Sequence, residues 1–75
     1  MNMQWALYGI KPGQRFIFKN IVNDIFLTLT SAEYTRSTYS STLFCFKFKD
    51  QNGEEWIREN YTVSHFHNEF KRIGA

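Results

Sequence analysis

The stretch LFCFKFKDQNGEEW, residues 43–56, decides the fold of this chain. Its first half alternates in character, with phenylalanines at every second position and a cysteine and two lysines between them: Phe44, Phe46 and Phe48 against Cys45, Lys47 and Lys49. Successive side chains of a β-strand point to opposite faces, so the alternation predicts a strand over 43–49 with one aromatic face. Because a chain this short needs those rings for its core, we expect that face to be buried; the alternative is that the rings stay exposed and stack on bases.

The second half of the stretch predicts a hairpin. Asp50 stands at the first position of the turn and Gly53 at the fourth, which fits a type I turn followed by a glycine bulge. This register pairs Lys49 with Glu55 and Phe48 with Trp56, and both pairs stabilise a sheet. A two-residue Asn-Gly turn would instead place Trp56 opposite Lys49. The bulged register is therefore preferred, and the returning strand is expected over 54–61.

Two more strands precede this hairpin. The turn Lys11-Pro12-Gly13 leads into a strand expected over 15–22, and a second strand is expected over 25–31. In the latter, Ile25, Leu27 and Leu29 share one face. The segment from residue 31 to 42 is rich in Ser and Thr and is either a polar loop or a frayed strand extension.

The end of the chain predicts a helix. Val63, Phe66, Phe70 and Ile73 recur at helical spacing, so a helix is expected over 64–73 with Phe66 and Phe70 buried. Ser64 is the expected N-terminal cap. Together these elements predict a mostly β (α+β) single domain over 1–75, with a small antiparallel sheet or a five-stranded barrel-like arrangement and one C-terminal helix.

Composition agrees with a small folded domain. The 75 residues are 43% hydrophobic and 19% aromatic, enough for a dense core in a short chain. Cys45 is the single cysteine, which excludes an internal disulfide and favours a reducing compartment. No signal-peptide pattern or membrane-spanning apolar run is recognised, so we expect a soluble cytoplasmic protein.

The order of elements resembles small β-barrels of the Src-homology-three type. The resemblance covers residues 13–57: Gly13-Gln14-Arg15-Phe16 opens the first strand, a long polar segment separates the second and third strands, and a tight hairpin follows. The C-terminal helix and the segment from Trp5 to Tyr8 have no counterpart in the plainest barrels. The resemblance implies binding to peptides, proteins or nucleic acids rather than catalysis.

Residues that could carry chemistry are few. His65 and His67 are two positions apart, so on a helix they point to different sides and make a poor metal site even with Cys45. Cys45 lies mid-strand without an oxyanion-forming turn beside it, and it is expected to be a buried packing residue. We recognise no phosphate-binding loop or dinucleotide fingerprint. The sequence therefore predicts a non-enzymatic protein without metal or cofactor.

The expected mode of action is therefore binding, and two classes of partner are considered. The first is docking on a protein partner, as in phage or mobile-element factors that inhibit a host or defence protein. Its expected anchors are aromatic and arginine side chains outside the predicted core: Tyr34, Arg36, Tyr39, Trp5 and Tyr8. The second is a small nucleic-acid-binding β-barrel that uses basic strand residues: Arg15, Lys19, Lys47 and Lys49. The net charge of +2 produces only a weak electrostatic field, which favours the protein partner over nucleic acid.

Overall fold

The fold is a strongly curved antiparallel sheet with a helix against it. The computed structural model describes residues 9–19 and 24–74. Within these residues five strands form one sheet in the order β4-β3-β2-β1-β5. The elements, in chain order, are β1 (Arg15–Phe18), β2 (Ile25–Ser37), β3 (Thr42–Asp50), β4 (Glu55–Tyr61), α2 (Val63–Glu69) and β5 (Phe70–Ile73). The mostly β fold class, with an antiparallel sheet and a helix near the C-terminus, is confirmed.

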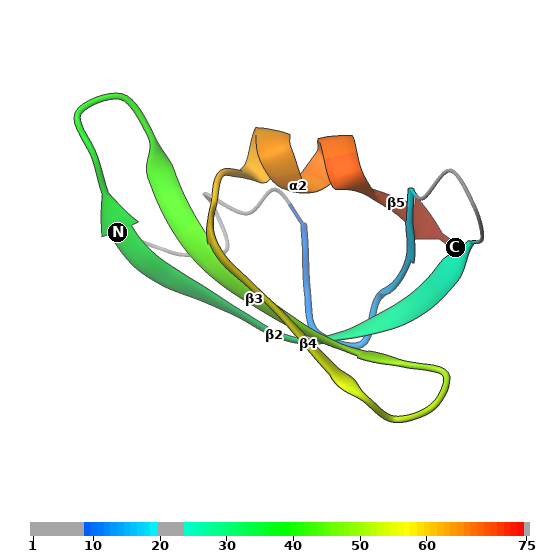
Figure 1. The fold of residues 1–75 in the computed structure, drawn as a ribbon. Coiled ribbons are helices and arrows are strands. Elements are labelled where there is room, and N and C mark those ends of the chain that lie inside the picture. The colour runs from blue at the N-terminus through cyan, green and yellow to red at the C-terminus, as the bar shows by residue number, and fades with distance from the viewer. Residues whose placement is uncertain (1–8, 20–23, 75) are drawn as a thin grey trace.

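The helix α2 covers the concave side of the curved sheet, and the core lies between them (Figure 1). The buried side chains of the described chain are all apolar and mostly aromatic: Ile10, Phe16, Leu27, Leu29, Phe44, Phe46, Phe48, Phe66 and Phe70. The three alternating phenylalanines of β3 are at most 1% exposed. They form the core face, as the size of the chain led us to expect, and in this structure their rings are not accessible for stacking on bases.

The β3–β4 hairpin has the expected bulged register. Phe48 lies opposite Trp56, and Lys49 lies opposite Glu55. Gly53 has a φ of 80°, a left-handed conformation that glycine adopts without strain. Its amide donates to the carbonyl of Asp50 at 3.1 Å, which closes the type I turn.

The end of the chain differs from the expected helix over 64–73. The helix stops at Glu69, and the following four residues form β5, with Phe70 opposite Phe18 and Ile73 opposite Arg15. The cap is Thr62 rather than Ser64, since the Thr62 hydroxyl accepts the amide of His65 at 3.0 Å. The prediction was wrong because a short strand along β1 pairs backbone groups at the sheet edge that a longer helix would leave open. Phe66 and Phe70 are nevertheless both buried, as expected.

The expected boundaries of β2 were also wrong. The strand continues six residues past residue 31, to Ser37, so most of the Ser/Thr-rich segment is the strand extension rather than the loop. Register shifts lie between Leu29 and Ser31 and between Tyr34 and Arg36. Each adds one residue to β2, a bulge that bends the strand and resets which residues face the core. The alternation is therefore broken twice, and it does not reveal the full strand.

At the N-terminal side, β1 is shorter than the expected 15–22. It ends at Phe18, Lys19 is not in a strand, and residues 20–23 lie outside the described chain. Trp5 and Tyr8, two of the expected partner-binding residues, lie outside it as well.

Candidate binding surface

A two-stranded arm projects from the body of the domain. We use this name for residues 33–43, the far ends of β2 and β3 with the turn that joins them, which stand clear of the body in Figure 1. β1 pairs with β2 only from Ile25 to Thr28, and Leu29 bonds to Gly13 and Gln14. Beyond that point, no other strand of residues 9–19 and 24–74 joins β2 on that edge. A ribbon of two strands is only marginally stable alone, so the arm depends on the body that anchors it.

The arm carries the three candidate residues that the structure describes. Tyr39 is fully exposed in the turn, with a relative exposure of 108%. Tyr34 is 49% exposed; its ring meets the edge of Phe44 at 6.3 Å between centroids, and its hydroxyl donates to Ser37 Oγ at 3.1 Å. Arg36 is exposed. The structure thus places all three side chains, exposed, on a protruding segment, and their role in binding stays a prediction.

The three side chains leave the arm in different directions. Tyr34 lies opposite Phe44, whereas Arg36 lies opposite Leu43, the preceding residue of β3. Neighbouring strand residues point to opposite faces, so Tyr34 and Arg36 occupy opposite faces of the ribbon and Tyr39 occupies its tip. Such an arrangement does not form one flat patch. It suits insertion of the arm into a groove that contacts both faces.

The turn of the arm is internally bonded. The amide of Thr38 donates to the carbonyl of Ser41 at 2.7 Å, and the Thr38 hydroxyl both donates to that carbonyl and accepts the amide of Ser41. These bonds fix the backbone on either side of Tyr39. A side chain on a fixed turn loses less freedom on binding than one on an unstructured loop.

Three of the four cations proposed for nucleic acid share the outer face of the sheet, the face opposite the buried phenylalanines. Arg15 pairs with Thr28, and Thr28 pairs with Lys49, so these residues form one row across β1, β2 and β3. Lys47 lies two positions along β3 on the same face. The row is not purely basic, because Glu55 lies opposite Lys49 on β4.

The fourth cation has a structural role instead. The ammonium group of Lys19 donates to the carbonyl of His67 at 3.2 Å, and the Lys19 amide donates to the carbonyl of Glu69 at 2.9 Å. Both carbonyls belong to the last turn of α2, where backbone acceptors lack partners within the helix. Lys19 therefore caps the helix end and complements its dipole.

Cys45 lies on the outer face rather than in the core, so its expected burial was wrong. It is half-buried, lies opposite Glu33 of β2 and interacts electrostatically with Glu59 of β4. Desolvation first, and then the carboxylate of Glu59, raise the pKa of the Cys45 thiol, while Lys47 acts in the opposite direction. At neutral pH the thiol is protonated, and the protonated form is a poor nucleophile.

The histidines are separate from Cys45. His65 stacks on Tyr61, with ring centroids 4.0 Å apart, and its Nε2 lies 3.3 Å from Glu69 Oε2, the surface pair that the helical spacing indicates. The other oxygen of Glu69 accepts the hydroxyl of Tyr61 at 2.7 Å. Burial first, and then this carboxylate, raise the pKa of Tyr61. Within the described chain, no three His, Cys, Asp or Glu side chains gather in a way that could hold a metal ion.

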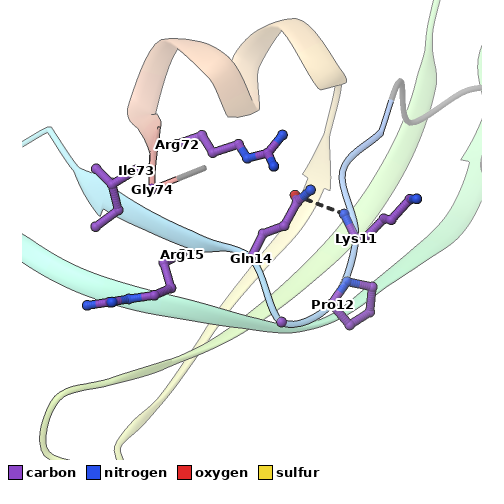
Figure 2. Close-up of a pocket in the computed structure, with 8 residues that line it drawn as sticks. Lys11, Pro12, Gln14, Arg15, Arg72, Ile73 and Gly74 are labelled. Carbon is purple, nitrogen blue, oxygen red and sulfur yellow. Dashed lines mark hydrogen bonds between the residues drawn. The ribbon is translucent and has the colours of Figure 1, made fainter.

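Sequence reasoning missed a basic cleft at the end of the sheet, where the loop before β1 meets β5. Its volume is about 470 Å³, and it is lined by Lys11, Pro12, Gly13, Gln14, Arg15, Arg72, Ile73 and Gly74. Figure 2 shows these residues. The cleft could not be anticipated because Arg72 was expected on a helix. It comes beside the loop only when residues 70–73 form β5.

Comparisons with known proteins add no relative. No family model, curated protein or solved structure matches the chain. The longest helix of the described residues is also far too short to cross a bilayer. Function must therefore be argued from the surfaces themselves.

Proposed function

We propose that this chain is a non-enzymatic binding domain that docks on a protein partner by means of the arm. The observation that supports this most is the exposure of Tyr39 at the tip of a projecting hairpin, with Tyr34 and Arg36 behind it on the two faces. Tyrosine and arginine are enriched among the residues that dominate binding energy at protein interfaces. A fully exposed tyrosine contributes nothing to the core of a domain this small.

The rest of the arm fits a recognition role. Its other side chains are mainly Ser and Thr, small polar groups that hydrogen-bond adaptably next to aromatic anchors. Within residues 9–19 and 24–74, one edge of the far half of β2 has no neighbouring strand, so its backbone donors and acceptors face outward. An extended segment of a partner can pair along such an edge while side chains provide specificity.

The proposal is tested on a partner first captured by affinity purification from the native cell and then produced in pure form. Replacing Tyr39 with alanine should weaken binding by at least about 2 kcal/mol, because a truncated hot spot costs that much. The melting temperature should stay unchanged, since the Tyr39 side chain is fully exposed. The double replacement Tyr34→Ala with Arg36→Ala should weaken binding as well. Gln51→Ala, at the opposite hairpin, is the control and should bind as the wild type does.

The same experiment tests the nucleic-acid alternative. Lys47→Glu with Lys49→Glu reverses two charges of the outer face, so this variant should lose affinity only if that face binds phosphates. The difference in affinity between this variant and the wild type would then shrink as the salt concentration rises, because counterion release drives phosphate binding. A loss confined to the lysine variant, with a steep salt dependence, would contradict the proposal. Full binding by both arm variants would contradict it too.

A further inference from the structure

The charged residues that line the basic cleft are all positive. Three of its eight lining residues are cationic, Lys11, Arg15 and Arg72, and none is acidic. Within the described ranges, none of the three makes a salt bridge. No lysine or arginine elsewhere in these ranges makes a salt bridge either, although Lys49 lies opposite Glu55 and Lys19 bonds to a helix carbonyl. What distinguishes the cleft is that three positive charges gather on eight lining residues with no acidic side chain among them.

The wall of the cleft is held in place before any ligand arrives. The side-chain amide of Gln14 spans the loop: its Oε1 accepts the amide of Lys11 at 3.0 Å, and its Nε2 donates to the carbonyl of Gly9 at 2.8 Å. The amide of Gly13 donates to the carbonyl of Leu29 at 2.8 Å, which fixes the loop to β2. Gly13 has a φ of 95°, so the turn depends on glycine. Binding need not first order this backbone.

The side chains around the cleft have distinct positions. In Figure 2 the side chain of Arg72 extends toward Gln14, whereas Arg15 and Lys11 point outward on either side. Three like charges, with no acidic side chain among the described residues that line the cleft, repel one another, and a doubly charged anion would reduce that repulsion. Both outward side chains are exposed and long, so their charged ends can turn toward a ligand held by Arg72. Pro12 and Ile73 supply apolar surface in the same cleft.

We propose that this cleft binds a small phosphomonoester, with the phosphate on Arg72 and the cations of Lys11 and Arg15, and with its less polar part against Pro12 and Ile73. A phosphate monoester carries close to two negative charges at neutral pH and presents three acceptor oxygens. An arginine guanidinium matches such a group with paired donors. The volume of about 470 Å³ also exceeds what a bare phosphate would occupy and lies within the range of small-molecule sites.

A nucleic-acid strand fits the cleft less well. Single-stranded sites need a basic track several nucleotides long with aromatic rings exposed for stacking. The described residues that line the cleft include no aromatic side chain, and the buried β3 phenylalanines are not accessible. The inference is independent of the arm, which lies at another part of the sheet (Figure 1).

The test is a titration of the isotope-labelled protein followed by amide chemical shifts. Two probes are used, inorganic phosphate and phenyl phosphate, with phenol as the uncharged counterpart. Saturable shifts are expected at residues 11–15 and 72–74 with both phosphates and not with phenol. Phenyl phosphate should bind more tightly, because its ring can contact Pro12 and Ile73. Higher salt should weaken both.

Variants decide whether the site is specific. Arg72→Gln should weaken phenyl phosphate binding at least roughly tenfold, as expected for the loss of charged hydrogen bonds, and Arg72→Lys should lose less. The matched control is Lys71→Gln, which removes the same charge from the adjacent β5 residue, which does not line the cleft, and should bind normally. Equal losses in Lys71→Gln and Arg72→Gln would overturn the proposal, since they would indicate a general charge effect. No saturable shift, or tighter binding of a single-stranded oligonucleotide with shifts at Lys47 and Lys49, would overturn it as well.

Discussion

Asp50 is the residue on which the β3–β4 turn depends. Its Oδ1 accepts the amides of Asn52 and Glu54, each at 2.9 Å, and its Oδ2 accepts the indole N–H of Trp56 at 3.2 Å. One carboxylate thus satisfies turn donors and orients the aromatic partner of Phe48. The Asp-x-Asn-Gly pattern gave the turn type and the register, but the indole bond could not be read from it, because the bond depends on how Trp56 packs.

The charge of Asp50 should make stability depend on pH. The hydrogen bond from the Glu54 amide contributes most to lowering the pKa of Asp50 below its ordinary value of 3.8, with further bonds from Trp56, Asn52 and Gly53. A carboxylate whose pKa is lowered by folding contributes stability above its unfolded pKa, and that stability is lost as pH falls through the folded pKa. Asp50→Ala should therefore be less stable than the wild type at neutral pH. The difference should shrink below about pH 4.

Urea unfolding of the two proteins across this pH range measures the difference. Asp24→Ala, at an exposed residue whose carboxylate accepts no hydrogen bond within the described chain, is the control and should show no such trend. A gap between Asp50→Ala and wild type that stays constant down to low pH would contradict the role of the charged form.

At the scale of elements, sequence patterns located the strands better than their ends. The alternation of β3 and the turn at Gly53 lie in regular structure, where local residues decide the outcome. The full length of β2 and the existence of β5 were missed, because both depend on contacts across the sheet. Two bulges interrupt the alternation of β2, and four residues are too few for a period of two to outweigh helical spacing. The resemblance to barrels of the Src-homology-three type stays a prediction.

The candidate binding residues show the same contrast between local sequence patterns and contacts made across the sheet. Tyr34, Arg36 and Tyr39 were found because an aromatic or arginine side chain in a Ser/Thr-rich segment is conspicuous. Arg72 was missed because its place in the cleft requires β5 to lie beside β1. Residues brought together by sheet topology carry no local signal.

The edge strand β4 contains a bulge that the sequence did not reveal. Phe44 lies opposite Tyr61 and Phe46 opposite Arg58, so β4 has one residue more than β3 between these pairs. Asn60, next to Tyr61, has a φ of 59°. Asparagine tolerates this left-handed conformation, whereas a β-branched residue does not.

Asn60→Val should therefore destabilise the protein by about 1–2 kcal/mol, and Asn60→Gly should be as stable as the wild type. Chemical unfolding measures both variants. Glu55→Val places the same side chain at an exposed position of β4 without positive φ, and it should be tolerated, since valine favours strands. The bulge assignment fails if valine is accepted equally at both positions.

At the scale of the whole molecule, aromatic packing joins the helix to the sheet. Phe66 of α2 lies 4.4 Å from Phe46 and 5.0 Å from Phe16 between ring centroids, and Phe70 lies 4.6 Å from Phe48. These rings come from β1, β3, α2 and β5, so one cluster connects the helix with two inner strands and with the edge strand β5. Rings of this size remove enough apolar surface from water to hold together a chain without disulfides.

Phe70→Ala should cost roughly 3–5 kcal/mol, a large fraction of the stability of so small a domain. The melting temperature should fall by more than about 10 °C. Lys71→Ala is the matched control in the same strand, and it should melt close to the wild type because its side chain is exposed. A Phe70→Ala variant that melts with the wild type would show that β5 and α2 are not packed as described.

The central claim is that the arm is the docking surface, and amide hydrogen exchange tests it most directly. Exchange is measured on the free protein and on its complex with the purified partner. One edge of β2 beyond Thr30 has no neighbouring strand among the described residues, so the arm should exchange faster than the core strands when free. In the complex, residues 33–43 should gain the strongest protection, while the β3–β4 turn around Gly53 should change little. Unchanged exchange in the arm, with new protection on the outer face around Lys47 and Lys49, would contradict the account.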